Sequence, residues 1–198
     1  AYKSIFNTVG TPGTSPATAL VLLQAQQKLN ESAAGMAPRY ATVNPAANAG
    51  LVNGLSGFFN PTTTISQQFK NGMMGTGVLG FEEINMSQSI KVHTTGSRAG
   101  TILVNGAVST QGQSTISIDG LTGATDTVTV GDVFTIANVF AVNPQTREST
   151  GSLQQFVVTA AQTGVSNALA NMAISPPIYT QPQAPWLPLT AFPLTTLP

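Results

Sequence analysis

A glycine-rich segment carries the clearest match to a chemical motif in this sequence. Gly75-Thr-Gly-Val-Leu-Gly80 matches the dinucleotide-binding fingerprint G-x-G-x-x-G letter by letter. That fingerprint needs a strand before it and a helix after it, because the pyrophosphate must meet a helix N-terminus. Here a polar segment, Gln67–Asn71, precedes the glycines and a strand-like stretch follows them. We therefore predict a flexible loop at residues 75–80 and no nucleotide site.

Side chains that could act as acids or bases are few. Glu82 and Glu83 are adjacent; in a strand they point to opposite faces, so we expect one exposed carboxylate and one in a salt bridge. His93 is the only histidine, which excludes multi-histidine metal sites and leaves one candidate general base. A serine hydrolase would also need a nucleophile elbow, G-x-S-x-G, and none occurs. We expect His93 to be a surface or interface histidine on a strand.

Three aspartates, Asp119, Asp126 and Asp132, are the acids that could complete a triad with His93. They lie beside glycine or in turn-rich sequence, where aspartate side chains cap the local backbone. Their spacing does not match the calcium loop of an EF-hand. We expect backbone capping rather than catalysis or calcium binding.

Two proline spacings near the end of the sequence, Pro182-x-x-Pro185 and Pro185-x-x-Pro188, resemble polyproline ligands. No basic residue flanks them, and such spacings arise often by chance in a proline-rich segment. Taken with the preceding motifs, the sequence predicts no catalytic, cofactor-binding or metal-ligating residue and no cofactor. We expect the protein not to be an enzyme.

The composition is unusually poor in charge. Of 198 residues only 7% are charged, with 7 basic and 7 acidic side chains, against about 25% in a typical soluble domain. This balance gives no electrostatic footprint for nucleic acid or for an anionic membrane. There is no cysteine, no apolar run long enough to span a bilayer, and no signal-peptide layout at residues 1–10. The composition fits either a surface covered by neighbouring subunits or a neutral extracellular β-rich module.

The first part of the chain, to about residue 95, has the pattern of an α+β region. Pro16 suits the first position of a helix, and Asn44-Pro45 is a cap-then-proline pair that predicts another helix. Asn60-Pro61 repeats that pair. The predicted elements are helices over 16–32, 45–55 and 65–70, a strand over 40–43, a strand with a possible bulge over 81–86, and a strand over 90–94.

After Arg98 the pattern is that of short strands separated by Gly, Asn and Asp, typical of a β barrel or sandwich. The strands are predicted over 101–104, 114–118, 126–130, 133–136, 139–142 and 153–159. Polar Thr135 and Gln155 mark the outward sides of two of them. The core-facing residues are then Phe134, Ile136, Phe156 and Val158, whereas Val157 points outward under a loop or a neighbour.

The last residues, from Pro176 onward, contain seven prolines and no charge. Proline lacks the N–H that a sheet interior or a helix requires. We predict that this segment cannot pair in a sheet interior, and that residues 179–198 form an extended or disordered tail.

Two blocks resemble a known family. One is Arg39-Tyr-Ala-Thr-Val-Asn-Pro-Ala-Ala-Asn-Ala-Gly-Leu-Val-Asn-Gly-Leu55 with Asn71-Gly-Met-Met-Gly-Thr-Gly-Val-Leu-Gly-Phe-Glu-Glu-Ile84. The other runs from Val130-Gly-Asp-Val-Phe-Thr-Ile136 to Gln154-Gln-Phe-Val-Val158. Together they resemble the major capsid (coat) proteins of tailed bacteriophages, in the podovirus branch whose prototype is Salmonella phage P-twenty-two.

The resemblance implies an α+β fold of the Hong-Kong-ninety-seven capsid type with an added all-β, barrel-like insertion domain. Residues 1–95 would be capsid core and residues 96–178 the insertion domain. The function implied is that of a structural subunit, which assembles into hexamers and pentamers of an icosahedral shell around double-stranded DNA. Scaffolding protein and portal would be partners, with no sequence-specific nucleic acid binding and no membrane. The protein would lie in the virion after assembly in the host cytoplasm.

The chain departs from the family pattern in two ways. An amino-terminal arm, an extended loop and a long spine helix cannot be placed, and the end from about Tyr179 does not resemble the family's return to the capsid core. We therefore expect a partial or truncated member. The alternative is a β-rich phage-tail or surface module that recognises carbohydrate or protein through loops such as Thr94–Gly100 and Gln111–Asp126.

Overall fold

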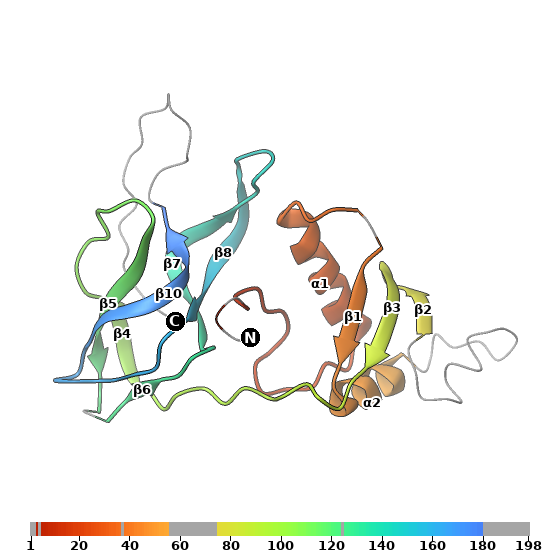
Figure 1. Ribbon diagram of the computed structural model, residues 1–198, viewed down its shortest axis with the longest axis horizontal. Helices are drawn as coiled ribbons and strands as arrows, with labels where there is room; N and C mark the ends of the chain where they lie inside the picture. Colours follow the sequence, from red (N-terminus) through yellow and green to blue (C-terminus); the bar gives the residue numbers. More distant parts are fainter. Residues whose placement is uncertain (1–2, 4, 37, 56–74, 124, 180–198) are drawn as a thin grey trace, which may run out of the picture. The chain divides into compact units, whose positions relative to one another are not determined.

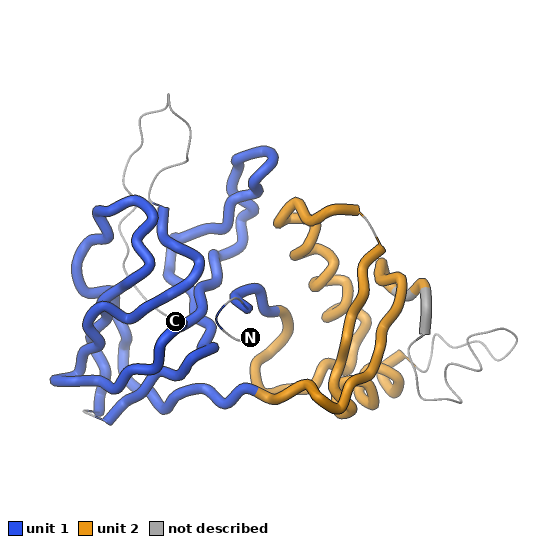
Figure 2. Tube along the Cα trace, viewed as in Figure 1, with its two compact units in different colours: residues 1–8, 93–198 blue, residues 9–92 orange. Residues whose placement is uncertain are grey.

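The computed structural model describes residues 3, 5–36, 38–55, 75–123 and 125–179. The chain is mixed helix and sheet, and most of its regular structure is β (Figure 1). It divides into two compact units (Figure 2): unit 1 is Ala1–Thr8 with His93–Pro198, and unit 2 is Val9–Val92. Among the described residues, no helix is long and apolar enough to cross a membrane.

Unit 2 contains two helices and a three-stranded sheet. Its elements are α1 (Ala19–Glu31), β1 (Tyr40–Val43), α2 (Pro45–Gly54), β2 (Gly75–Val78) and β3 (Phe81–Met86). The strand order is β1-β3-β2, with β1 parallel and β2 antiparallel to the central β3. The buried core of this unit consists of Leu22, Leu51, Leu55, Phe81 and Ile84.

The two helices of unit 2 match their predictions unequally. As expected, Asn44 caps α2, accepting a bond of 2.8 Å from the Ala47 amide to its side-chain oxygen. Helix α1 begins later than predicted, at Ala19, with Thr18 as its N-cap. The backbone of the residues just before it, Pro16 and Ala17, instead packs closely against two glycines of α2, Gly50 and Gly54.

The glycine-rich segment forms a β-hairpin, so the prediction of a flexible loop there is wrong. Strands β2 and β3 pair with Val78 opposite Phe81. The two residues between them have positive φ, 50° at Leu79 and 83° at Gly80, as a type I′ turn requires. The glycines therefore serve hairpin geometry.

The bulge, one strand and one helix predicted between residues 65 and 94 have different outcomes. The register of β3 with both its neighbours is regular, so the bulge predicted near residues 81–86 is absent there. The strand predicted over 90–94 does not form, because residues 87–99 have no strand partner. The helix predicted over 65–70 lies outside the described residues.

Unit 1 is built on a curled antiparallel sheet with the strand order β4-β5-β10-β8-β7, which has the form of a half-barrel. Strands β6 and β9 form a separate two-stranded antiparallel sheet. The strands are β4 (Gly100–Val104), β5 (Gln113–Leu121), β6 (Thr127–Val128), β7 (Val133–Val142), β8 (Ser149–Val158), β9 (Gln162–Thr163) and β10 (Leu169–Ile178).

Two strands of unit 1 differ from prediction. The strands predicted over 133–136 and 139–142 are one strand, β7, whose interior accommodates Asn138 at a φ of 64°. Strand β10 was not predicted. It occupies the middle of the sheet and includes Pro176 and Pro177, so the prediction that nothing from Pro176 onward pairs in a sheet interior is wrong. The prolines fit because they lie in an irregular stretch of the β10–β5 ladder.

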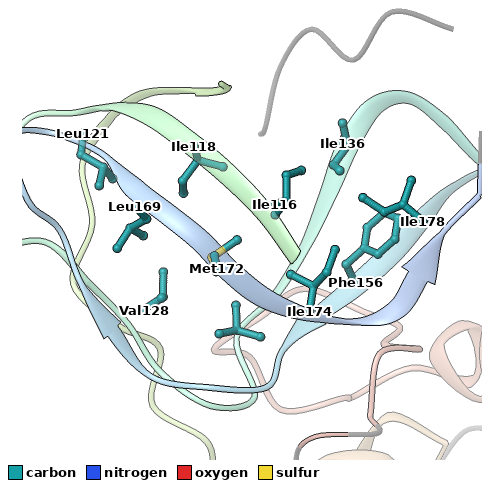
Figure 3. Close-up of a cluster of buried hydrophobic side chains, with 11 residues drawn as sticks. Ile116, Ile118, Leu121, Val128, Ile136, Phe156, Leu169, Met172, Ile174 and Ile178 are labelled. Atoms are coloured by element: carbon teal, nitrogen blue, oxygen red, sulfur yellow. The ribbon is translucent and has the colours of Figure 1, made fainter. Parts of the chain in front are cut away.

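The predicted core face of unit 1 is confirmed. Ile136 and Phe156 are buried in one cluster (Figure 3). Val158 belongs to the same cluster, and Phe134 packs against it. Phe134 and Phe156 pair directly across β7 and β8, with their rings stacked at a centroid distance of 5.8 Å. Val157, on the opposite face, is also fully buried. The other buried members of the cluster are Ile116, Ile118, Leu121, Val128, Leu169, Met172, Ile174 and Ile178.

Candidate functional site

The strongest polar cluster of the described residues surrounds Asp132, at the turn that enters β7. Its carboxylate accepts a bond of 2.9 Å from the Thr129 amide and one of 3.0 Å from the Thr129 hydroxyl. A backbone bond runs in the opposite direction: the Asp132 amide donates to the Thr129 carbonyl at 3.1 Å. These reciprocal bonds define a tight turn that holds the carboxylate in place.

The same carboxylate binds a segment far away in sequence. His93 Nε2 lies 2.8 Å from one carboxylate oxygen of Asp132 and Arg98 donates to the other at 2.9 Å. The Gly96 amide donates to both oxygens, at 3.3 and 3.2 Å. The Asp132 side chain is 0% exposed, whereas those of His93 and Arg98 are 24% and 25% exposed. Asp132 is therefore a buried anion bound by partly exposed cationic or polar groups.

Burial and hydrogen bonding act on Asp132 in opposite directions. Removal from water by itself raises the pKa of a carboxyl group. Bonds from the Thr129 amide, from His93, from the Gly96 amide and from the Thr129 hydroxyl outweigh that effect, so the pKa of Asp132 is lowered. The carboxylate is consequently charged at neutral pH, which suits an electrostatic anchor and not a proton donor.

Asp126 makes a second, smaller anchor of the same kind. Its side chain accepts bonds from the Gly123 amide at 3.2 Å and from the Ala99 amide at 3.3 Å. The predicted capping role is thus confirmed for Asp126 and Asp132. It is wrong for Asp119, which lies within strand β5, opposite Leu103 of β4.

The Asp132 cluster pairs a histidine with an aspartate, two parts of the triad that the sequence allowed. The hydroxyl in the cluster, that of Thr129, donates to Asp132 and not to the imidazole, so the geometry does not activate it as a nucleophile. His93 itself lies outside any strand, which corrects the prediction for its setting. It is held there by the long-range bond to Asp132.

Two hollows in the described part of the chain differ in size and in lining. One cavity of about 20 Å³ lies in the unit 1 core beside Arg98 and Met172, a volume that suits a water molecule. A groove of about 600 Å³ in unit 2 runs along residues 9–18 and the start of α1, and none of its lining residues is charged. Among the described residues, no three His, Asp or Glu side chains are grouped to hold a metal ion.

Comparison with known proteins adds no identification. No protein-family model matches the chain, and no curated protein matches it.

The remaining predictions concern two glutamates, two proline spacings and two loops. Glu82 is exposed and Glu83 half-buried on β3, and neither forms an ion pair with a described residue, so the expected salt bridge is not found there. The two proline spacings lie outside the described residues. Of the two loops suggested for a binding module, Thr94–Gly100 is bonded to Asp126 and Asp132. Most of the other, Gln111–Asp126, is strand β5.

Sequence reasoning missed Gly96, Arg98 and Thr129 as members of the cluster. A local signal existed for Thr129, because Thr-x-x-Asp has the spacing of a capping box, in which the acidic side chain accepts from the amide of the hydroxyl residue. No local signal existed for the other two, since Gly96 and Arg98 stand 36 and 34 positions from Asp132.

Proposed function

We propose that this chain is a structural subunit of a tailed-phage capsid, with a fold related to the Hong-Kong-ninety-seven type and an all-β insertion domain. The two sequence blocks that resemble the coat proteins carry this proposal. Its subunits associate into hexamers and pentamers of a shell around double-stranded DNA, with scaffolding protein and portal as partners. The protein then resides in the virion.

The character of the surface supports association with other subunits. Only 7% of the chain is charged, and its formal net charge is zero, so free copies repel one another weakly. Large apolar side chains are nevertheless exposed in both units, including Leu20 on α1 at 61% and Phe140 on β7 at 44%. Covering such side chains with neighbouring copies would remove apolar area from water.

The described polar clusters support a structural role as well. The two buried carboxylates, Asp126 and Asp132, are bonded to backbone amides and to side chains of their own unit. No buried side-chain nitrogen or oxygen among the described residues lacks a hydrogen-bond partner. Active sites often keep polar groups whose hydrogen bonds are incomplete. In the Asp132 cluster, by contrast, each buried side-chain nitrogen and oxygen has a hydrogen-bond partner.

Electron microscopy of the full-length protein expressed in bacteria tests the proposal. We expect closed shells, or sheets of hexameric and pentameric capsomers. Two variants, Leu20→Asp in unit 2 and Phe140→Asp in unit 1, each place a charge on an exposed apolar position. The variant that impairs assembly identifies the unit that contributes to the contacts between subunits. Thr146→Asp is the control, since Thr146 is an exposed polar residue of the β7–β8 connection.

A protein that stays monomeric at every concentration would contradict the capsid proposal. If that monomer bound a carbohydrate or a peptide, the result would favour the alternative function, that of a β-rich binding module.

A further inference from the structure

Three Asn-Gly pairs occur in the sequence, beginning at Asn53, Asn71 and Asn105. This dipeptide is prone to a spontaneous reaction, because glycine has no side chain to hinder attack by its own amide nitrogen on the asparagine before it. Asn71 lies outside the described residues. The structure places the other two pairs in opposite settings, one in a loop of unit 1 and one in a helix of unit 2.

Asn105 stands in the connection between β4 and β5, directly after the last residue of β4. Asn105 and Gly106 are both exposed, and open space surrounds the position that a Cβ of Gly106 would occupy. Among the described residues, none hydrogen-bonds the Asn105 side chain or accepts from the Gly106 amide. The side chain can therefore turn toward the Gly106 nitrogen without breaking a hydrogen bond to a described residue.

Asn53 and Gly54 form the end of α2. In an α-helix the amide of Gly54 donates to the carbonyl four residues before it, and the next amide, that of Leu55, continues the pattern with a bond of 2.9 Å to the Leu51 carbonyl. The backbone of Ala17 also packs closely against Gly54. The Gly54 nitrogen can therefore attack the Asn53 side chain only after this end of the helix has opened.

We propose that Asn105 is a site of spontaneous deamidation, which proceeds through a succinimide formed with Gly106. The Gly106 nitrogen attacks the side-chain carbonyl carbon of Asn105, so that a new C–N bond forms and the bond to the side-chain amide nitrogen breaks. That nitrogen leaves as ammonia, with the proton that the Gly106 amide releases. Water then opens the ring at one carbonyl group or the other, which yields isoaspartate or aspartate.

The reaction changes both the charge and the main chain of the β4–β5 connection. Either product adds one negative charge to a chain whose formal net charge is zero. Isoaspartate also inserts an extra carbon atom into the main chain between two attachments of the connection. One is the Asn105 amide, which donates to the Ser117 carbonyl at 2.8 Å, and the other is Val108, which packs against the unit 1 core. This inference is independent of the proposed capsid function.

Ageing of the full chain at mildly alkaline pH, followed by tryptic digestion and mass spectrometry, tests the proposal. Trypsin separates the two sites into the peptides 40–70 and 99–147, and fragment ions locate each conversion. In the folded protein we expect Asn105 to convert at least about tenfold faster than Asn53, because ring closure depends on the approach of the two reacting atoms. Labelling by an isoaspartyl methyltransferase should detect isoaspartate at position 105, which direct hydrolysis of the side-chain amide does not produce.

Two controls separate the effect of the fold from that of the sequence. In concentrated urea both pairs are released from their folded settings, so Asn53 and Asn105 should convert at similar rates. Asn105→Gln keeps a side-chain amide but requires a larger ring, so this position should stay unconverted over the same period. If Asn105 converted no faster than Asn53 in the folded protein, the proposal would be wrong. Conversion of Asn105 to aspartate alone, without isoaspartate, would overturn the succinimide route.

Discussion

The two units solve the problem of close packing by different means. Among the described residues of unit 2, the buried ones are apolar apart from Asn48, and two glycines of α2 allow a neighbouring backbone to pack closely against the helix. In unit 1 the apolar cluster between the strands is accompanied by two buried carboxylates, Asp126 and Asp132. We infer that unit 2 is sensitive to side-chain volume, whereas unit 1 is sensitive both to volume and to charge.

The contrast follows from topology. In unit 2 the backbone of Pro16 and Ala17, just before α1, approaches two glycines of α2, so a missing Cβ suffices for the contact. Unit 1 also includes residues 93–99, which have no strand partner, so the amides of Gly96 and Ala99 need acceptors from elsewhere. Two aspartates provide acceptors for that segment.

The largest expected effect lies in the unit 1 core. Phe156 is 2% exposed and stacks on Phe134, so Phe156→Ala should lower the free energy of unfolding by about 3–5 kcal/mol. Thr135→Ala, on the outward face of β7, should change it by less than about 0.5 kcal/mol. Chemical denaturation followed by circular dichroism measures both. Equal costs would mean that the core face has been assigned to the wrong side of β7.

A smaller effect is expected from added volume in unit 2. An alanine at position 54 would place its Cβ against the carbonyl group of Ala17, and overpacking of this kind typically costs about 1–3 kcal/mol. Gly35→Ala is the matched control, because nothing lies within 4 Å of a Cβ built there. Thermal unfolding of the two variants separates them, and a Gly54→Ala protein as stable as Gly35→Ala would refute the close contact.

Charge removal in unit 1 should have a comparable cost. Asp132→Asn keeps the size of the side chain but turns one acceptor into a donor that faces the donors of Thr129, Gly96 or Arg98. One such unsatisfied buried group costs about 1–3 kcal/mol. Urea denaturation should show this loss in the unit 1 transition, with Asp119→Asn unaffected. If Asp132→Asn left the free energy of unfolding unchanged, unit 1 would not be sensitive to charge and would not differ from unit 2 in this respect.

The pH dependence of stability sharpens the same distinction. The pKa of Asp132 is lowered in the folded state, so its contribution to stability is present above the unfolded value, about 3.9, and disappears as pH falls through the lowered folded value. Stability of unit 1 should therefore decline on acidification below about pH 4. The decline should be shallower in Asp132→Asn than in the unaltered protein.

Local patterns predicted the elements that depend on local interactions. The Asn44-Pro45 pair predicted α2, and alternation around Thr135 predicted the face that Phe134 and Ile136 present to the core. Strand β10 was not predicted because its place in the sheet comes from pairing with β5 and β8, which are distant in sequence. That pairing outweighs the unfavourable effect of the prolines at the end of the strand. The Asp132 cluster escaped for a related reason, since His93 and Asp132 are 39 positions apart.

We infer that unit 1 is a β structure that folds by itself and whose first segment, residues 93–99, is held by the buried carboxylate of Asp132. Thermal unfolding of two fragments, residues 93–179 and 99–179, tests it most directly. The longer fragment retains His93, Gly96 and Arg98, and we expect it to show a strand-dominated circular dichroism spectrum with a cooperative transition. The shorter one leaves Asp132 without these partners and should melt at a clearly lower temperature or not fold. Equal transitions in both fragments, or a non-cooperative longer fragment, would contradict the account.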